Sequence, residues 1–170
     1  VSSFNSFIKP LEVGNFFYNL AYIYKKIYEY DKSIYFGRQA LDIFKEWYFL
    51  EFALQCHVLL AICYNNTQRT EQALNSYELA QKIIPFLPQN SHSYHYSIIE
   101  NNIGKCYENL NNYNQALHYY IKSFENPKND DKMISNINII RCYYKLDNLE
   151  MGRHWLEKTK HSINKTTPNK

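Results

Sequence analysis

The stretch NNIGKCYENLNNYNQALHYYIKS, residues 101–123, decides the fold. Within it an apolar residue and Gly104 form a pair, and Tyr107 follows three residues after the glycine. Two small residues, Ala116 and Ser123, lie nine and sixteen positions beyond that tyrosine. Small residues let two helix backbones approach closely, while the large side chain between them fills the adjoining space. The stretch therefore predicts two helices packed against each other through small residues.

The same pattern occurs four times along the chain. Its copies align on Tyr24, Tyr64, Tyr107 and Tyr143, and the fourth copy is the weakest. One helix pair of this kind cannot bury its apolar face alone, so successive copies must stack. Glycine (4 residues) and proline (5 residues) are scarce, which favours helices over strands. We therefore expect an all-α protein, a right-handed α-solenoid of about four helix-turn-helix repeats.

Helix boundaries follow from the repeats and from the turn residues between them. Pro85 and Pro88, and then Pro127, interrupt the chain between copies. We expect residues 1–13 to be the end of a preceding helix or a linker, 14–162 the solenoid, and 163–170 a disordered tail. The expected helices cover roughly residues 14–29, 32–45, 48–66, 70–84, 92–109, 113–125, 131–146 and 149–161.

Composition excludes several classes of function. The net charge is +3 and no cluster of lysine and arginine stands out, so we expect no direct contact with nucleic acid. The apolar stretch from Trp47 to Tyr64 could suggest a membrane span, but Glu51, Gln55 and His57 interrupt it, so we expect a buried helix and no membrane contact. No basic-then-apolar leader is visible, and the cysteines favour a cytoplasmic location.

Neither catalytic nor metal-binding patterns are found. The four cysteines have no CxxC spacing, and three of them directly precede an aligned tyrosine, where small packing residues are expected; these are Cys63, Cys106 and Cys142. His118 and His154 have no Cys or Asp partner at useful spacing, and no glycine-rich phosphate loop occurs. We expect a protein that is not an enzyme and that needs no metal or cofactor.

The aligned residues resemble the tetratricopeptide repeat (TPR) family over roughly residues 14–160. The copies are longer and less regular than the 34-residue type, since the aligned tyrosines lie 40, 43 and 36 residues apart. In this they are similar to the TPR-like domains of the Gram-positive peptide-sensing regulators of the Rap, NprR and PlcR group. The segments QALDIF (39–44), residues 101–123 and NIIRCYYKLDNLEMGRHWLEK (138–158) carry this narrower resemblance.

The resemblance implies a cytoplasmic quorum-sensing protein whose concave groove holds a short signalling peptide. In that group the output belongs to an N-terminal part, which is a DNA-binding domain in transcription regulators and a helical bundle in Rap phosphatases. Neither occurs in these 170 residues. A generic scaffold that docks a protein segment is the alternative, a regulatory domain of a Rap-type phosphatase is another, and a homodimer stays open.

In the TPR pattern the first helix of each pair lines the groove. The positions five and two residues before each aligned tyrosine then give the expected peptide-binding residues: Asn19, Tyr22, Leu59, Ile62, Asn102, Lys105, Asn138 and Arg141. An asparagine amide both donates and accepts, which suits a peptide backbone. Lys105 and Arg141 suit a carboxylate, and Leu59 with Ile62 an apolar side chain. The alternative is a solvated polar helix face without function.

Overall fold

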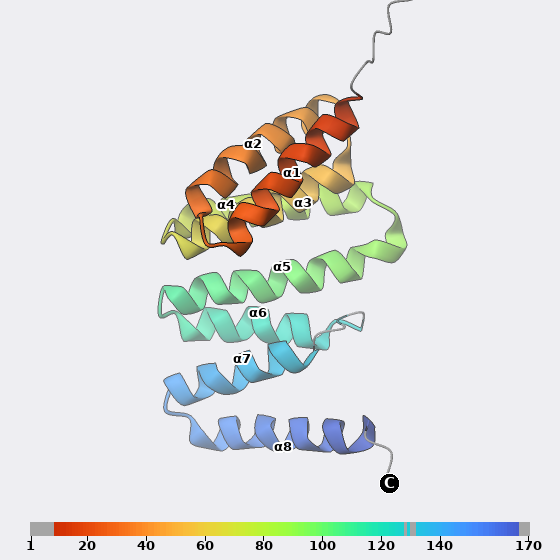
Figure 1. Cartoon of the computed structure of the whole chain (residues 1–170). Coiled ribbons are helices and arrows are strands. Elements are labelled where there is room, and N and C mark those ends of the chain that lie inside the picture. Colours follow the sequence, from red (N-terminus) through yellow and green to blue (C-terminus); the bar gives the residue numbers. More distant parts are fainter. Residues whose placement is uncertain (1–8, 128, 130–131, 167–170) are drawn as a thin grey trace, which may run out of the picture. The chain divides into compact units, whose positions relative to one another are not determined.

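A computed structural model describes residues 9–127, 129 and 132–166, with side chains up to Lys160. The described residues form eight α-helices and one short 3-10 helix, with no strand, which confirms the expected all-α repeat fold (Figure 1). The helices are α1 (Pro10–Lys26), α2 (Tyr30–Glu46), α3 (Leu50–Asn66), α4 (Thr70–Ile83), η1 (Ile84–Phe86), α5 (Gln89–Asn109), α6 (Tyr113–Glu125), α7 (Lys132–Lys145) and α8 (Leu149–Thr166).

Helix ends differ from the expected ones at both termini. Helix α1 begins at Pro10 rather than at residue 14, because a proline in the first turn gives up no intrahelical hydrogen bond. Helix α8 continues to Thr166, so residues 163–166 belong to a helix and not to the expected tail. The expectations for residues 1–8 and 167–170 lie outside the described residues.

The chain divides into two units, residues 1–89 and 90–170. In the first, α1 packs on α2, α2 on α3 and α3 on α4. In the second, α6 packs on α7 and α7 on α8, and Ser123 of α6 donates a hydrogen bond to the backbone carbonyl of Ser97 in α5 at 2.8 Å. Sequence neighbours therefore pack together within each unit, as in a repeat protein.

The turn inside each repeat has the same backbone hydrogen bond. The carbonyl of each aligned tyrosine accepts from the amide five residues later; the acceptors are Tyr24, Tyr64, Tyr107 and Tyr143, at 2.8–2.9 Å. One residue before each donor has a positive φ, between 55° and 65°, and none of these residues is glycine: Tyr28, Gln68, Asn111 and Asp147. This is the hydrogen bond that ends a helix through a left-handed residue.

The cysteines confirm the packing interpretation. Cys63, Cys106 and Cys142 are fully buried. Burial raises the pKa of both the Cys106 and the Cys142 thiol to about 12, so both remain protonated at neutral pH. Together with Leu117, Tyr120 and Ile139, Cys142 forms a core between α6 and α7. Each cysteine thus acts as a small packing residue.

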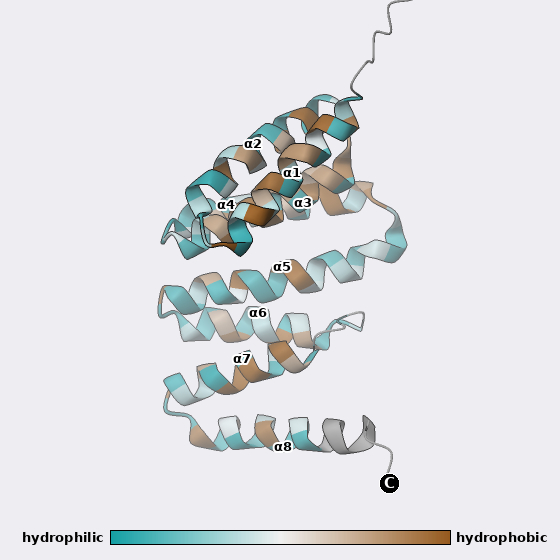
Figure 2. Cartoon of the chain, viewed as in Figure 1, coloured by the Kyte–Doolittle hydropathy of each residue, from teal (hydrophilic) through white to brown (hydrophobic). Residues whose placement is uncertain are grey.

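Most of the apolar stretch from Trp47 to Tyr64 belongs to helix α3. Its residues Leu54, Cys56 and Leu60 are buried in the first unit. Figure 2 shows apolar residues on this helix, whereas apolar and polar residues alternate along α7 and α8. Among the described helices, none combines the length and the apolar character that crossing a membrane requires.

Gly104 of α5 lies against the aromatic ring of Tyr120 in α6. A Cβ atom at residue 104 would lie 2.7 Å from ring carbon Cδ1, too close for any real contact. The ring cannot swing away freely, because the Tyr120 hydroxyl donates a 2.8 Å hydrogen bond to Glu108. At Gly152 of α8 the nearest atom, Cε2 of Tyr144, would lie at 3.4 Å, an ordinary contact.

These two glycines give a matched pair of substitutions in the second unit. We expect Gly104→Ala to lower the free energy of unfolding by roughly 1–3 kcal/mol, because the methyl group overpacks the helix contact. Gly152→Ala should raise it by up to about 1 kcal/mol, because alanine is the better helix former. Urea unfolding followed by circular dichroism measures both, and equal effects would contradict the helix contact at Gly104.

Candidate functional site

A cleft of about 140 Å³ opens between α5 and α7 in the second unit. Its walls come from one face of α5, from the start of α7 and from the segment that joins α6 to α7. The lining residues are Ser97, Ile98, Asn101, Asn102, Ser123, Asn129, Ile134 and Ser135. Residues spaced three and four apart on a helix share a face, which explains why Ile98, Asn101 and Asn102 line the cleft together.

Hydroxyl and amide groups form the floor of the cleft. The Oγ atoms of Ser123 and Ser135 lie 3.2 Å apart. The amide nitrogen of Asn129 donates to the Ser123 carbonyl at 2.8 Å and to the Ser135 hydroxyl at 3.1 Å. These groups are buried and bonded to one another, so the floor adds hydrogen bonds to the apolar contacts between α6 and α7.

Two asparagine amides of α5 form the wall. Asn101 accepts a hydrogen bond at its Oδ1 from Nδ2 of Asn138 in α7, at 3.1 Å. Asn102 donates from its Nδ2 to the carbonyl of Ile98, one turn back in its own helix, at 2.9 Å. Within the described residues this leaves two side-chain atoms without a partner, the amide nitrogen Nδ2 of Asn101 and the amide oxygen Oδ1 of Asn102. The wall thus offers the amide nitrogen of Asn101 as a donor and the amide oxygen of Asn102 as an acceptor.

An ion pair behind the wall fixes the direction of the Asn101 amide through Asn138. The guanidinium of Arg141 in α7 donates two hydrogen bonds of 2.6 Å to the carboxylate of Glu108 in α5. A third bond, of 2.9 Å, runs from Arg141 to Oδ1 of Asn138. Because arginine can only donate, the amide nitrogen of Asn138 must point the other way, towards Asn101.

Glu108 is held as a carboxylate by its neighbours. Burial raises the pKa of its carboxyl, but hydrogen bonds from Arg141 and Tyr120 outweigh burial, so the pKa lies below the ordinary value of 4.5. Burial and the hydrogen bond to Glu108 raise the pKa of the Tyr120 hydroxyl, which therefore stays a donor. The pair of Glu108 and Arg141 links the two first helices of neighbouring repeats.

The second unit brings together four of the expected binding residues. Asn102 lines the cleft, and Lys105 lies exposed one turn further along α5. Asn138 is only 8% exposed, and its amide nitrogen donates to Asn101. Arg141 is not a free cation for a ligand, because Glu108 already holds it in a bidentate pair. Sequence spacing placed these residues on one face but could not reveal their partners.

In the first unit, Asn19 and Tyr22 are exposed on α1, with the Lys25 ammonium 4.4 Å from the centre of the Tyr22 ring. Ile62 of α3 is half-buried. Leu59 is only 2% exposed, so the expected apolar pocket at this position is wrong.

The burial of Leu59 has a local cause. Glycine at residue 37 of α2 lets α3 approach, and a Cβ atom there would meet Leu59 at 3.4 Å and Leu60 at 3.0 Å. Leu59 therefore contributes to the core between these two helices.

Sequence reasoning missed Asn101, Glu108 and the apolar side of the cleft. Ile134 and Ile137 of α7 are large apolar side chains with about half of their surface exposed, 49% and 51%. Each of these residues lies three or four positions from an expected groove residue on the same helix; they are Asn101, Glu108, Ile134 and Ile137. Extending the groove face by the helical spacing of three and four would have included them.

Comparison with known proteins agrees with this geometry. Residues 54–86 and 101–130 match the tetratricopeptide repeat family. The chain is similar to the transcriptional activator NprA of Geobacillus stearothermophilus, with 30% identity over 112 residues, which is 66% of this chain and 27% of NprA.

Two solved structures have the same fold. Aspartyl phosphate phosphatase F from Bacillus subtilis matches 92% of this chain and 42% of its own, with a TM-score of 0.82 and 20% identity. NprR in complex with its cognate peptide NprX matches 85% of this chain and 42% of its own, with a TM-score of 0.70 and 25% identity. The chain thus spans less than half the length of each of these relatives.

Replacing the carboxylate tests the link between α5 and α7. We expect Glu108→Gln to lower the free energy of unfolding by about 1–3 kcal/mol at pH 7, because the charged hydrogen bonds to Arg141 are lost. Exposed Glu125→Gln is the control and should have little effect.

The pH dependence of the Glu108→Gln effect has a defined sign. The folded pKa of Glu108 lies below 4.5, so its stabilisation is complete above about pH 4.5 and is lost as the pH falls through the folded pKa. The difference between wild type and variant should therefore shrink in acid. A difference that stays constant down to pH 2 would contradict the assignment.

Proposed function

We propose that this chain, a tetratricopeptide-repeat domain similar to NprA, binds a short signalling peptide and is the sensor part of a bacterial transcription regulator. The donor–acceptor pair of Asn101 and Asn102 at the cleft is the observation that carries this proposal. A peptide bond offers one carbonyl and one N–H, which match the free N–H of Asn101 and the free oxygen of Asn102.

The apolar side of the cleft suits a side chain of the same ligand. Ile98 and Ile134 flank the two amides, and Ile137 lies exposed one turn further along α7. A cleft of about 140 Å³ is large enough for one medium-sized apolar side chain and too small for a whole folded partner. We therefore propose an extended peptide with an apolar residue next to the peptide bond that the asparagines hold.

The expected groove residues divide between two surfaces in this proposal. Asn102 belongs to the cleft and Lys105 lies one turn further along α5, while Asn138 and Arg141 act behind the cleft by orienting the Asn101 amide. Asn19, Tyr22 and Ile62 lie in the first unit and would contact a different part of the ligand.

The output of the whole protein is part of the proposal as well. Similarity to NprA supports transcription regulation, and a regulator that acts on DNA would work in the cytoplasm. A binding role rather than catalysis fits the cleft, whose floor and wall are neutral amides and hydroxyls. A regulatory domain of a Rap-type phosphatase is the second candidate, favoured by the fold shared with phosphatase F.

Calorimetric titration with a library of short apolar peptides tests the amide pair. Each asparagine hydrogen bond should contribute roughly 0.5–1.5 kcal/mol. Combining Asn101→Ala with Asn102→Ala should therefore weaken binding of the tightest peptide by about ten- to a hundredfold.

Asn114→Ala on α6 serves as the control for the amide pair, because Asn114 is exposed and does not line the cleft. A folded double variant that binds as tightly as wild type would remove the cleft from the proposal. A protein that binds only folded partners and no short peptide would favour the scaffold alternative.

The positive charge of Lys105 should make peptide binding depend on the salt concentration. Lys105 is exposed on the cleft side of α5, whereas Arg141 is neutralised by Glu108. We expect Lys105→Gln to reduce the loss of affinity between low and high salt for a peptide that carries a carboxylate, because exposed charges are screened. The same salt dependence in wild type and variant would show that Lys105 does not attract the peptide.

A further inference from the structure

A second pocket opens between α5 and α6, on a different face of α5 from the cleft. Its volume is about 420 Å³, within the range of about 300–1,000 Å³ that ligand pockets commonly have. Helix α5 contributes Ser93, Tyr96 and Glu100, which are spaced three and four residues apart and so share one face. The cleft is lined by other residues of α5, and the two have no lining residue in common.

Glu100 brings a buried carboxylate to this pocket. Its side chain is 4% exposed, and its Oε1 atom lies 2.8 Å from the Lys122 ammonium of α6. The hydrogen bond to Glu100 raises the pKa of the Lys122 ammonium, so this group is charged at neutral pH. In the part of the chain that the structure describes, Lys122 is the one ion-pair partner of Glu100.

Glu108 shows how many donors a less buried carboxylate of the same helix receives. Its side chain is 17% exposed, and it accepts one hydrogen bond from Tyr120 and two from Arg141. Glu100 is more deeply buried and has the ammonium of Lys122 instead. Burying a carboxylate is costly unless its oxygen atoms are hydrogen-bonded. Because Glu100 lines an open pocket, a ligand that enters this pocket can supply further donors.

The rest of the lining adds a second carboxylate and two rings. Glu125 is exposed near the end of α6. Tyr96 contributes an aromatic ring and Pro127 an aliphatic one. The side-chain amide of Asn126 donates a 2.8 Å hydrogen bond to the carbonyl of Ser93, which ties the end of α6 to the start of α5. The walls of the pocket are therefore held together by a fixed contact.

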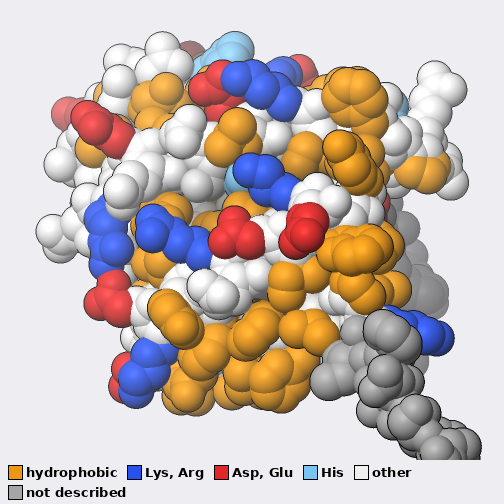
Figure 3. Space-filling view, turned by 90° about the horizontal axis from the view of Figure 1, so that it is seen from above, with side chains coloured by type: hydrophobic (Ala, Val, Ile, Leu, Met, Phe, Trp, Pro, Cys, Tyr) orange, Lys and Arg blue, Asp and Glu red, His pale blue; other side chains and the backbone are white. Residues whose placement is uncertain are grey.

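The lining of the pocket is negative. It contains two glutamates and one lysine, a formal charge of −1. Charged groups on the surface of the first unit are balanced instead, as where the ammonium of Lys32 lies 3.4 Å from Glu29. Figure 3 looks onto α1 and α2 and shows acidic and basic side chains next to one another on that side. A cation is the ligand that a negative pocket attracts.

We propose that this pocket binds a guanidinium group, the head of an arginine side chain. A guanidinium is planar and has five N–H donors, so it can bond to carboxylates through paired hydrogen bonds. Glu100 and Glu125 supply the carboxylates. The ring of Tyr96 supplies a face on which a planar cation can stack.

Calorimetric titration of the 170-residue chain tests this proposal with two sources of the group, free L-arginine and the blocked tripeptide acetyl-Gly-Arg-Gly-amide. The control for each is its citrulline counterpart, in which an uncharged urea group of similar shape replaces the guanidinium. We expect the citrulline compounds to bind at least about tenfold more weakly, because their hydrogen bonds to the carboxylates lose the charge. Tighter binding of the tripeptide identifies an arginine within a polypeptide, and tighter binding of L-arginine identifies the free amino acid.

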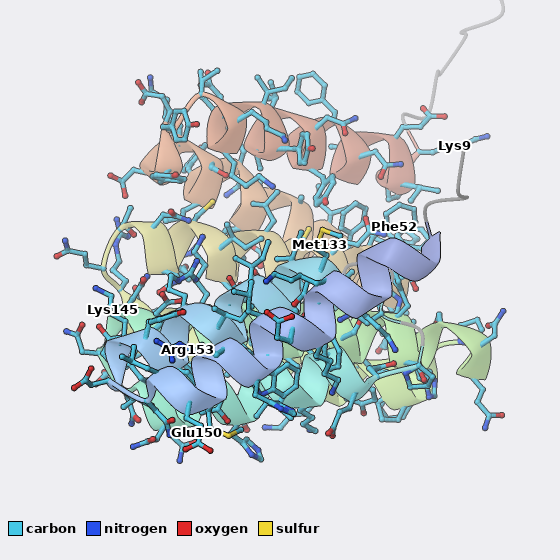
Figure 4. The ribbon with its side chains drawn as sticks, turned by 90° about the horizontal axis from the view of Figure 1, so that it is seen from below. Lys9, Phe52, Met133, Lys145, Glu150 and Arg153 are labelled. Atoms are coloured by element: carbon cyan, nitrogen blue, oxygen red, sulfur yellow. The ribbon has the colours of Figure 1, made fainter. Side chains whose placement is uncertain are left out.

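Substitutions locate the binding. Glu100→Gln should weaken arginine binding by about tenfold or more, and Glu125→Gln by about three- to tenfold. Since Glu125 is exposed, its variant should keep the melting temperature of the wild type and is informative even if Glu100→Gln does not fold. The matched control is Glu150→Gln on α8, an exposed glutamate that is labelled in Figure 4 and does not line the pocket.

Three results would overturn the proposal. The first is equal binding of the arginine and citrulline compounds, or no binding of either arginine compound at about 10 mM. The second is a folded Glu125→Gln variant that binds arginine as tightly as wild type. The third is an equal loss of affinity in Glu150→Gln, since binding would then depend on the net charge of the chain and not on the pocket.

Discussion

The close contact between Gly104 and the ring of Tyr120 is the constraint on which the second unit depends. Since no side chain at residue 104 keeps α5 and α6 apart, the tyrosine ring fills the space between the two backbones. Its hydroxyl then reaches Glu108 on α5, and Glu108 in turn holds Arg141 on α7. The close packing of α5 and α6 thereby positions the Glu108 carboxylate, which binds Arg141 of α7.

The proposed binding surface follows from the same contact. Arg141 orients Asn138, and Asn138 orients Asn101, so the Asn101 side-chain amide in the cleft lies four hydrogen bonds away from the Tyr120 hydroxyl. Hydrogen bonds in a chain of this kind strengthen one another, and each buried group has a partner within it. The cleft is therefore preorganised by the core rather than by the mobility of a loop, which reduces the entropy that a ligand must overcome on binding.

The repeat pattern was sufficient to predict the fold and the helices that carry the site. Spacing alone identifies small and large packing positions, so the buried state of Cys106 and the two helices within residues 101–123 could be predicted. The partner of Arg141 could not be, because Glu108 lies 33 residues away and the pairing depends on how two repeats stack. Leu59 was misplaced for a similar reason, since its burial depends on the neighbouring helix, where a Cβ atom at residue 37 would lie 3.4 Å from it. Positions within a helix are local properties, whereas the neighbours of a side chain are not.

The left-handed turn residues have a consequence for how far the stability of this chain could be increased. Tyr28, Tyr48 and Gln68 adopt a positive φ that costs an ordinary side chain roughly 1–2 kcal/mol and that glycine adopts freely. All three are exposed, so their side chains contribute little to the core. The turns of the first unit therefore hold conformational strain that could be relieved without altering a single buried contact. An engineer who wanted a heat-resistant version of this scaffold would begin at the loops and leave the helices as they are.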